Sequence, residues 1–170
     1  MTCIFLLSDT HSHWNNEWVK YFKEADEIWH AGDIGNETII QHITKYSANK
    51  PLRIVYGNID NSLVRMQTKP YLCFALEGFQ ILITHNAGPF GKYNTNTKQC
   101  IQTHHPHLLI CGHSHILKVK WDKFHNLWYI NPGAAGLYGS HKISSALLFE
   151  LHQQKIQNMQ IIQWTKEHAG

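Results

Sequence analysis

The chain has 170 residues, a length that suits one domain over residues 1–170 with a single hydrophobic core. Apolar residues make up 43% and charged residues 16%, which is typical of a globular protein and excludes a disordered chain. The formal charge of +3, with no run of lysine or arginine, argues against a nucleic-acid partner.

The cysteines and the N-terminal sequence bear on where the protein works. The four cysteines form no CxxC pair, so a disulfide framework is not expected in a chain of this size. The first apolar run is too short for a secretion signal, and no segment approaches the roughly 20 apolar residues that span a bilayer. We therefore expect a cytoplasmic protein without a membrane partner.

The first 60 residues predict alternating strands and helices. Short apolar runs at 3–7, 27–30 and 52–56 are typical of strands buried on both faces. Between them, apolar residues spaced by three and four predict helices over 14–25 and 38–46. This alternation indicates a parallel sheet.

The second half predicts mainly strands. One helix is expected over 95–103 and one buried strand over 108–111. Three strand pairs are expected at 71–76 with 80–84, 117–121 with 127–130, and 146–151 with 156–164. The natural architecture is a mixed α/β domain with two sheets, and we expect the chain to fray after Thr165.

Side chains able to bind metal collect where the predicted strands stop. They are Asp9, His11, Asp33, Asn58, His85, His113 and His115. In open α/β sheets, ligands bind outside the carboxyl ends of the strands, so these side chains are expected to converge on one rim.

The residue types suit two divalent cations. Carboxylates, imidazoles and one amide form a hard-to-borderline ligand set, and one aspartate can bridge two ions about 3.5–4 Å apart. No cysteine occupies these positions, which disfavours a structural zinc site. Each short motif alone is most often an ordinary turn. The ordered combination of all of them is what indicates a metal site.

That ordered series resembles a known family. Asp9-Thr10-His11, Gly32-Asp33, Gly57-Asn58-Ile59-Asp60, Thr84-His85 and Gly112-His113-Ser114-His115 together resemble the calcineurin-like metallophosphoesterases. The spacing is most similar to the short single-domain bacterial and archaeal phosphodiesterases of that superfamily, and the resemblance spans residues 3 to about 151.

The resemblance implies a fold and a set of ligand roles. The expected fold is a four-layer α/β/β/α sandwich with two mixed sheets face to face and helices outside. Asp9, His11 and His115 would hold the first metal, Asn58, His85 and His113 the second, and Asp33 would bridge both. Asp33, Asn58 and His85 would thus act in catalysis through the metals, where a shared water, deprotonated to hydroxide, attacks phosphorus.

One position departs from the family pattern. Many relatives carry a histidine directly after the ligand asparagine, where it is thought to protonate the leaving group; this chain has Ile59. The leaving-group acid is therefore unassigned, with His13 and Asp60 as weak candidates. His30 is either a support for the metal ligands or a satisfied buried histidine. Trp14, Tyr93 and Tyr138 are candidate pocket walls.

The main hypothesis is a metal-dependent phosphodiesterase acting on a small phosphorylated substrate, with activity on monoesters left open. The alternatives are a non-catalytic binding or scaffold module on the same fold, and a nuclease. The resemblance favours manganese as the working ion, with iron, nickel or zinc as alternatives. A homo-oligomer is also left open.

Overall fold

Two five-stranded sheets form the centre of the fold. In the computed structural model, which describes residues 1–165, each sheet mixes parallel and antiparallel strands. The first sheet has the order β10 (Lys155–Thr165), β9 (Ile143–His152), β1 (Thr2–Leu7), β2 (Glu27–Ala31) and β3 (Leu52–Val55). The second has the order β4 (Tyr71–Leu76), β5 (Phe79–Thr84), β6 (Leu108–Ile110), β8 (Leu127–Asn131) and β7 (Lys118–Asp122).

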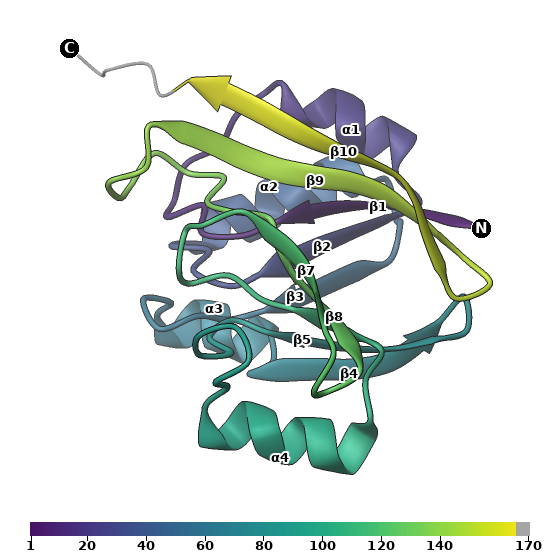
Figure 1. The fold of residues 1–170 in the computed structure, drawn as a ribbon. Helices are drawn as coiled ribbons and strands as arrows, with labels where there is room; N and C mark the ends of the chain where they lie inside the picture. The colour runs from purple at the N-terminus through teal and green to yellow at the C-terminus, as the bar shows by residue number, and fades with distance from the viewer. Residues whose placement is uncertain (166–170) are drawn as a thin grey trace.

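Helices cover the outer faces of the sheets. They are α1 (Trp18–Glu24), α2 (Glu37–Ser47), α3 (Ser62–Gln67) and α4 (Thr95–His104). In Figure 1, α1 and α2 lie behind the first sheet, and α4 lies below β4 and β5. The expected α/β sandwich with two mixed sheets is confirmed.

Three apolar clusters lie between these layers. Alternate residues of β1 face opposite sides, so Leu6 packs between the sheets while Phe5 packs toward α1 and α2. The third cluster joins the outer face of the second sheet to α4, for example through Leu109 and Ile101. Burial on both faces explains why the strands are continuous apolar runs in the sequence.

The parallel strands of each sheet end at a common edge. β1, β2 and β3 run parallel, with Leu7 opposite His30 and Ala31 opposite Val55. β5, β6 and β8 are also parallel, with Ile110 opposite both Ile83 and Ile130. The loops that follow these strands therefore leave their sheets together, and they carry the predicted metal ligands.

Two helical segments differ from the sequence prediction. The helix expected over 14–25 begins only at Trp18, because Asn15 Oδ1 accepts the Glu17 N–H at 2.9 Å and forms a turn before it. α3 is absent from the sequence prediction, since six residues give too few turns for an apolar period to show. Its start is nevertheless marked by Asn61, whose side chain accepts the Val64 N–H at 3.0 Å.

The sequence also gave expectations about membrane-spanning segments, disulfide bonds and the C-terminal residues. No helix within residues 1–165 is long and apolar enough to cross a membrane. All four cysteines, Cys3, Cys73, Cys100 and Cys111, are free thiols. The expected fraying after Thr165, and the last five residues of the proposed domain 1–170, lie outside the described residues.

The inter-sheet core should dominate stability. Leu6→Ala removes a fully buried side chain between the sheets and is expected to lower the free energy of unfolding by about 2–5 kcal/mol. The same substitution at Leu63, which is 54% exposed, should change it by less than about 0.5 kcal/mol. Urea denaturation followed by fluorescence measures both, and equal losses would contradict the packing described.

Candidate metal centre

The turns after the strands hold the predicted ligands in an uncommon backbone conformation. Five of the seven have positive φ: Asp9 (54°), His11 (47°), Asp33 (54°), His113 (67°) and His115 (58°). Left-handed backbone is uncommon for residues other than glycine, and such strain persists only where the surrounding structure enforces it. This clustering at one edge of the sheets indicates a functional site.

Glycines next to the ligands allow the loops to approach closely. A Cβ atom on Gly57 would collide with the Asp33 carboxylate. A Cβ atom on Gly112 would collide with Ser8 Oγ and with the Asp9 carboxylate. The glycines that precede Asn58 and His113 are therefore required by close packing against the two aspartates.

The first ligand group joins the loops after β1 and β6. Ligand atoms of Asp9, His11 and His115 all lie within 4.8 Å of one another. His11 Nε2 and His115 Nε2 are 3.3 Å apart, and Asp9 Oδ1 is 3.3 Å from His115 Nε2 and 3.9 Å from His11 Nε2. These atoms converge on one point between the loops.

The second group joins the loops after β2, β3, β5 and β6. Asp33, His85 and His113 offer ligand atoms within 4.8 Å of one another. The amide oxygen of Asn58 lies 3.2 Å from His85 Nε2 and 2.9 Å from His113 Nδ1. All seven residues singled out in the sequence are thus brought together in two adjoining groups.

Asp33 lies between the two groups. Its Oδ1 is 3.2 Å from His85 Nε2, in the second group, and its Oδ2 is 3.7 Å from His11 Nε2, in the first. Its Oδ1 also accepts the Ile59 N–H at 3.1 Å, which fixes the orientation of the carboxylate. One carboxylate therefore presents an oxygen to each group, an arrangement that suits a bridging ligand.

The donor atoms fit two cations. Donors that share one ion at bond lengths of about 2.0–2.2 Å lie roughly 3–3.5 Å apart, close to the separations found within each group. Asp9 Oδ1 is buried and accepts no hydrogen bond from any residue of 1–165, although it faces two imidazole nitrogens. A buried carboxylate oxygen without a partner is costly, and a cation at this point would satisfy it.

One of the two histidines of the second group, His85, is oriented for the same purpose. His85 Nδ1 lies 2.8 Å from the Ala31 carbonyl oxygen, so it carries the proton and donates it there. Nε2 then faces the side-chain oxygens of Asp33 and Asn58, and with the proton on Nδ1 its lone pair would be available to a cation placed between them. A backbone acceptor on the second ring nitrogen is the usual support of a metal-binding histidine.

The local electrostatics favour positive charge. Burial lowers the pKa of His85, but the hydrogen bond to Asp33 and the charges of Asp9 and Asp33 outweigh it, so the pKa is raised. Burial raises the pKa of Asp33, but His85 and the Ile59 N–H outweigh it and the net shift is downward. Burial lowers the pKa of His11, which keeps its ring neutral and available as a ligand. The carboxylates that attract a proton to His85 would equally attract a metal ion.

His30 supports the turns that carry the ligands. It is fully buried, and burial lowers its pKa to about 4. Its Nδ1 accepts the Gly32 N–H at 3.2 Å, so Nε2 carries the proton and donates to Thr10 Oγ1 at 3.0 Å. The ring thus links the residue before Asp33 to the residue after Asp9 and is satisfied as a neutral imidazole.

The two weak acid candidates occupy structural positions. Asp60 is buried, and its two oxygens accept the Gly35 and Gly57 N–H groups at 2.7 Å each. The His13 ring packs edge-on against Trp18 with 6.1 Å between ring centroids, and within residues 1–165 no hydrogen bond, ion pair or ring contact joins its side chain to a ligand residue.

Arg65 supports the site without having been singled out in the sequence. Its guanidinium donates to the carbonyl oxygens of Asp60, Gly57 and Asn58 at 2.7–3.3 Å and lies over the Tyr56 ring. It therefore holds the turn that presents the Asn58 amide. Arg65 lies in the unpredicted helix α3, so only recognition of that helix would have brought it to attention.

The solvent side of the centre is open. Asn58 and His113 are exposed, whereas Asp9, Asp33 and His85 are buried. Tyr138, 70% exposed, lies over the His11 ring with 4.9 Å between ring centroids. Of the other predicted pocket walls, Trp14 lines a separate cavity with His13, and Tyr93 is buried with its hydroxyl on Asp122. Substrate can reach the centre from the Asn58–His113 side.

A known protein family matches most of this chain. The family model described as "Calcineurin-like phosphoesterase superfamily domain" matches residues 2–154. No curated protein matches.

Several solved structures share the fold. An archaeal phosphodiesterase is 18% identical with a TM-score of 0.74, covering 94% of this chain and 99% of its own. A predicted phosphoesterase from Streptococcus pneumoniae is 16% identical with a TM-score of 0.65, covering 96% and 89%. Zn²⁺-complexed Vps29 from Entamoeba histolytica is 14% identical with a TM-score of 0.70, covering 96% and 98%. At these identities the likeness shows the fold alone.

Metal titration tests the ligand set. We expect the chelator-treated protein to bind about two Mn²⁺ ions per chain, as a shared carboxylate between two groups implies. Asp33→Ala and Asp33→Asn should remove at least one of them, because each removes an anionic oxygen that both groups face. Isothermal titration calorimetry gives the stoichiometry.

A surface carboxylate provides the matched control. Glu24→Ala truncates an exposed residue at the end of α1 and should leave both ions bound. Thermal melts of each metal-free variant separate loss of a ligand from loss of the fold. Unchanged stoichiometry in folded Asp33→Ala would contradict the bridging role.

Proposed function

Because the chain belongs to the calcineurin-like phosphoesterase superfamily, we propose that it is a metal-dependent phosphodiesterase that hydrolyses a small phosphodiester. The observation that carries this proposal is the position of Asp33 between two complete ligand groups. A site that only needed one structural ion would not require a second set of ligands around a shared carboxylate. Two adjoining cations are the usual arrangement for displacement at phosphorus.

The residues of the chain have defined tasks in this proposal. Asp9, His11 and His115 would hold one ion, Asn58, His85 and His113 the other, and Asp33 both. Bound divalent ions would supply Lewis acidity, which activates the attacking water and neutralises charge on the phosphoryl oxygens. The fixed turns hold these ligands in place before substrate arrives, so that little reorganisation is needed during the reaction.

Departure of the leaving group is the step with least support from the protein. Ile59, 45% exposed beside Asn58, has no proton to give. Asp60 already accepts two backbone hydrogen bonds, and the His13 ring packs on Trp18. We therefore propose that the enzyme acts best on esters whose leaving group departs without protonation.

A scaffold role is the second candidate. The fold is shared with Vps29, and Ile59, exposed beside Asn58, has no acid–base chemistry to offer at the centre. Metal binding does not separate the two functions, because the Vps29 structure is itself described as complexed with Zn²⁺. Hydrolysis of a phosphate ester does separate the enzyme from the scaffold.

Substrate size and metal identity complete the proposal. The sequence has a formal charge of only +3 and no run of lysine or arginine, which favours a small diester over polymeric nucleic acid. We propose manganese as the working ion, with iron, nickel or zinc also compatible with mixed nitrogen and oxygen ligands.

Restoration of activity by metal tests the proposed function. Metal-stripped protein should not hydrolyse bis(p-nitrophenyl) phosphate, and added Mn²⁺ should restore release of p-nitrophenolate. Asp33→Ala should lose at least about 100-fold in turnover, the order of loss typical of removing electrostatic stabilisation of a transition state. Glu24→Ala should retain wild-type rates. A fully metal-loaded wild-type protein that hydrolyses neither diesters nor monoesters would favour the scaffold role.

Comparison of leaving groups tests the missing acid. The wild type should hydrolyse a p-nitrophenyl diester far faster than a dialkyl diester, because no positioned group protonates an alkoxide. His13→Ala should change both rates by the same factor, since its ring packs on Trp18.

The matched control is His42→Ala, which truncates another histidine of the same aromatic cluster, in contact with Trp14. A loss in His13→Ala confined to the dialkyl diester, and absent from His42→Ala, would identify His13 as the acid.

A further inference from the structure

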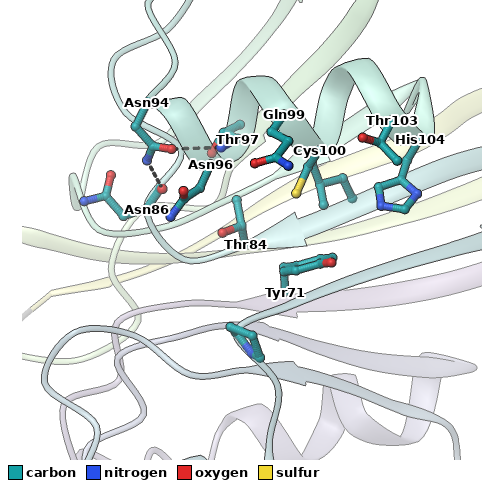
Figure 2. A pocket seen from close by; sticks show the side chains of 12 residues that line it. Tyr71, Thr84, Asn86, Asn94, Asn96, Thr97, Gln99, Cys100, Thr103 and His104 are labelled. Carbon is teal, nitrogen blue, oxygen red and sulfur yellow. Dashed lines mark hydrogen bonds between the residues drawn. The ribbon is translucent and has the colours of Figure 1, made fainter.

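A polar groove lies beside the metal centre, between α4 and the β4–β5 hairpin. It has a volume of about 450 Å³. Figure 2 shows side chains of α4 above the groove, Thr84 of β5 at its back and the Tyr71 ring of β4 below. The volume falls within the range of sites that bind small organic ligands.

The groove adjoins the candidate metal centre. A smaller pocket is lined by the ligand residues Asn58 and His85 together with Pro70, Thr84 and Asn86. The last three residues also line the groove. A substrate with its phosphorus at the metal ligands can therefore extend one of its ester groups along this path.

Hydrogen-bonding groups in the groove are free to bind a ligand. The side-chain amides of Asn96 and Gln99 make no hydrogen bond within residues 1–165, and Figure 2 shows both on the groove side of α4. By contrast, Asn94 is already used: its Oδ1 accepts the Thr97 N–H at 2.9 Å and its Nδ2 donates to the Asn86 carbonyl oxygen at 2.6 Å. Each free amide offers a donor beside an acceptor.

The lining also excludes some ligands. Among the described residues, the groove is lined by no aspartate, glutamate, lysine or arginine. The one basic side chain among these lining residues, His104 in the last turn of α4, lies at the end of the groove opposite Asn86 (Figure 2), so a second phosphate or a carboxylate near the centre would find no lysine or arginine there. The Tyr71 ring, 43% exposed, instead offers an aromatic face. Paired donors and acceptors beside an aromatic ring suit a planar, uncharged heterocycle, because such rings stack and bond side-chain amides through their edges.

We propose that this groove is a substrate subsite for a nucleoside, which forms the non-leaving ester group of the diester. The subsite rests on the proposed function for its place in catalysis, but its binding of a nucleoside does not require the metals. Gln99 is a specificity-determining residue, with Asn96 beside it, and the Tyr71 ring packs on the base.

Two substrates with one leaving group test the subsite. Thymidine 5′-(p-nitrophenyl phosphate) and ethyl p-nitrophenyl phosphate both release p-nitrophenolate and differ only in the group that would enter the groove. We expect a higher kcat/KM for the thymidine diester. Gln99→Ala should lower kcat/KM for that diester by about five- to tenfold, the loss of one or two neutral hydrogen bonds, and leave the ethyl diester unchanged.

The same helix provides the control. Gln102→Ala removes the same side chain three residues away, where it is exposed and outside the groove lining, and should behave as wild type on both substrates. Equal values of kcat/KM for the two diesters in the wild type, or the same loss in both variants, would overturn the proposal.

Direct binding separates the subsite from the proposed function. Saturation-transfer NMR of thymidine with metal-stripped protein should show binding in the wild type and in Gln102→Ala, and a weaker signal in Gln99→Ala. Binding in this pattern without hydrolysis of either diester would retain the subsite and reject the phosphodiesterase. Hydrolysis of both diesters without thymidine binding would retain the phosphodiesterase and reject the subsite.

Discussion

The burial of two carboxylates side by side is the constraint on which the site depends. Asp9 is fully buried and Asp33 is 3% exposed, and His11 faces both. Like charges out of water are unstable unless hydrogen bonds and positive charge compensate them. The Ser8 hydroxyl and the His113 N–H donate hydrogen bonds to Asp9 Oδ2, and the Ile59 N–H donates one to Asp33 Oδ1. Asp9 Oδ1 accepts no hydrogen bond from any described residue. Bound cations would complete this arrangement.

The two sheets make this compensation structurally feasible. Parallel strands from both end at one edge, so seven ligands from five loops reach the same small volume. The loops turn sharply through left-handed backbone at five of these residues, supported by strands buried on both faces. Rigid sheets thus hold the strained turns, while Asn58 and His113 leave one side of the centre open to solvent.

Chemistry and selectivity occupy neighbouring but different parts of the molecule. In the proposed function, the metal ligands would act on phosphorus and would not distinguish one ester group from another. The groove under α4 begins at Thr84 and Asn86, on either side of His85, and would read the group attached to phosphorus. Loops and helix faces beside a fixed centre allow one fold to serve different substrates.

The sequence by itself determined the strands and the two-sheet architecture, because buried strands are apolar runs. It also singled out the candidate metal ligands, because they come directly after those strands. It did not reveal α3 or the support by Arg65, since six residues leave no apolar period. It also left Asp60 and His13 as candidates for the leaving-group acid. In the fold, two backbone N–H groups donate hydrogen bonds to Asp60, and the His13 ring packs against Trp18. The groove depends on α4 meeting a distant hairpin, and only tertiary structure decides which side chains share such a surface.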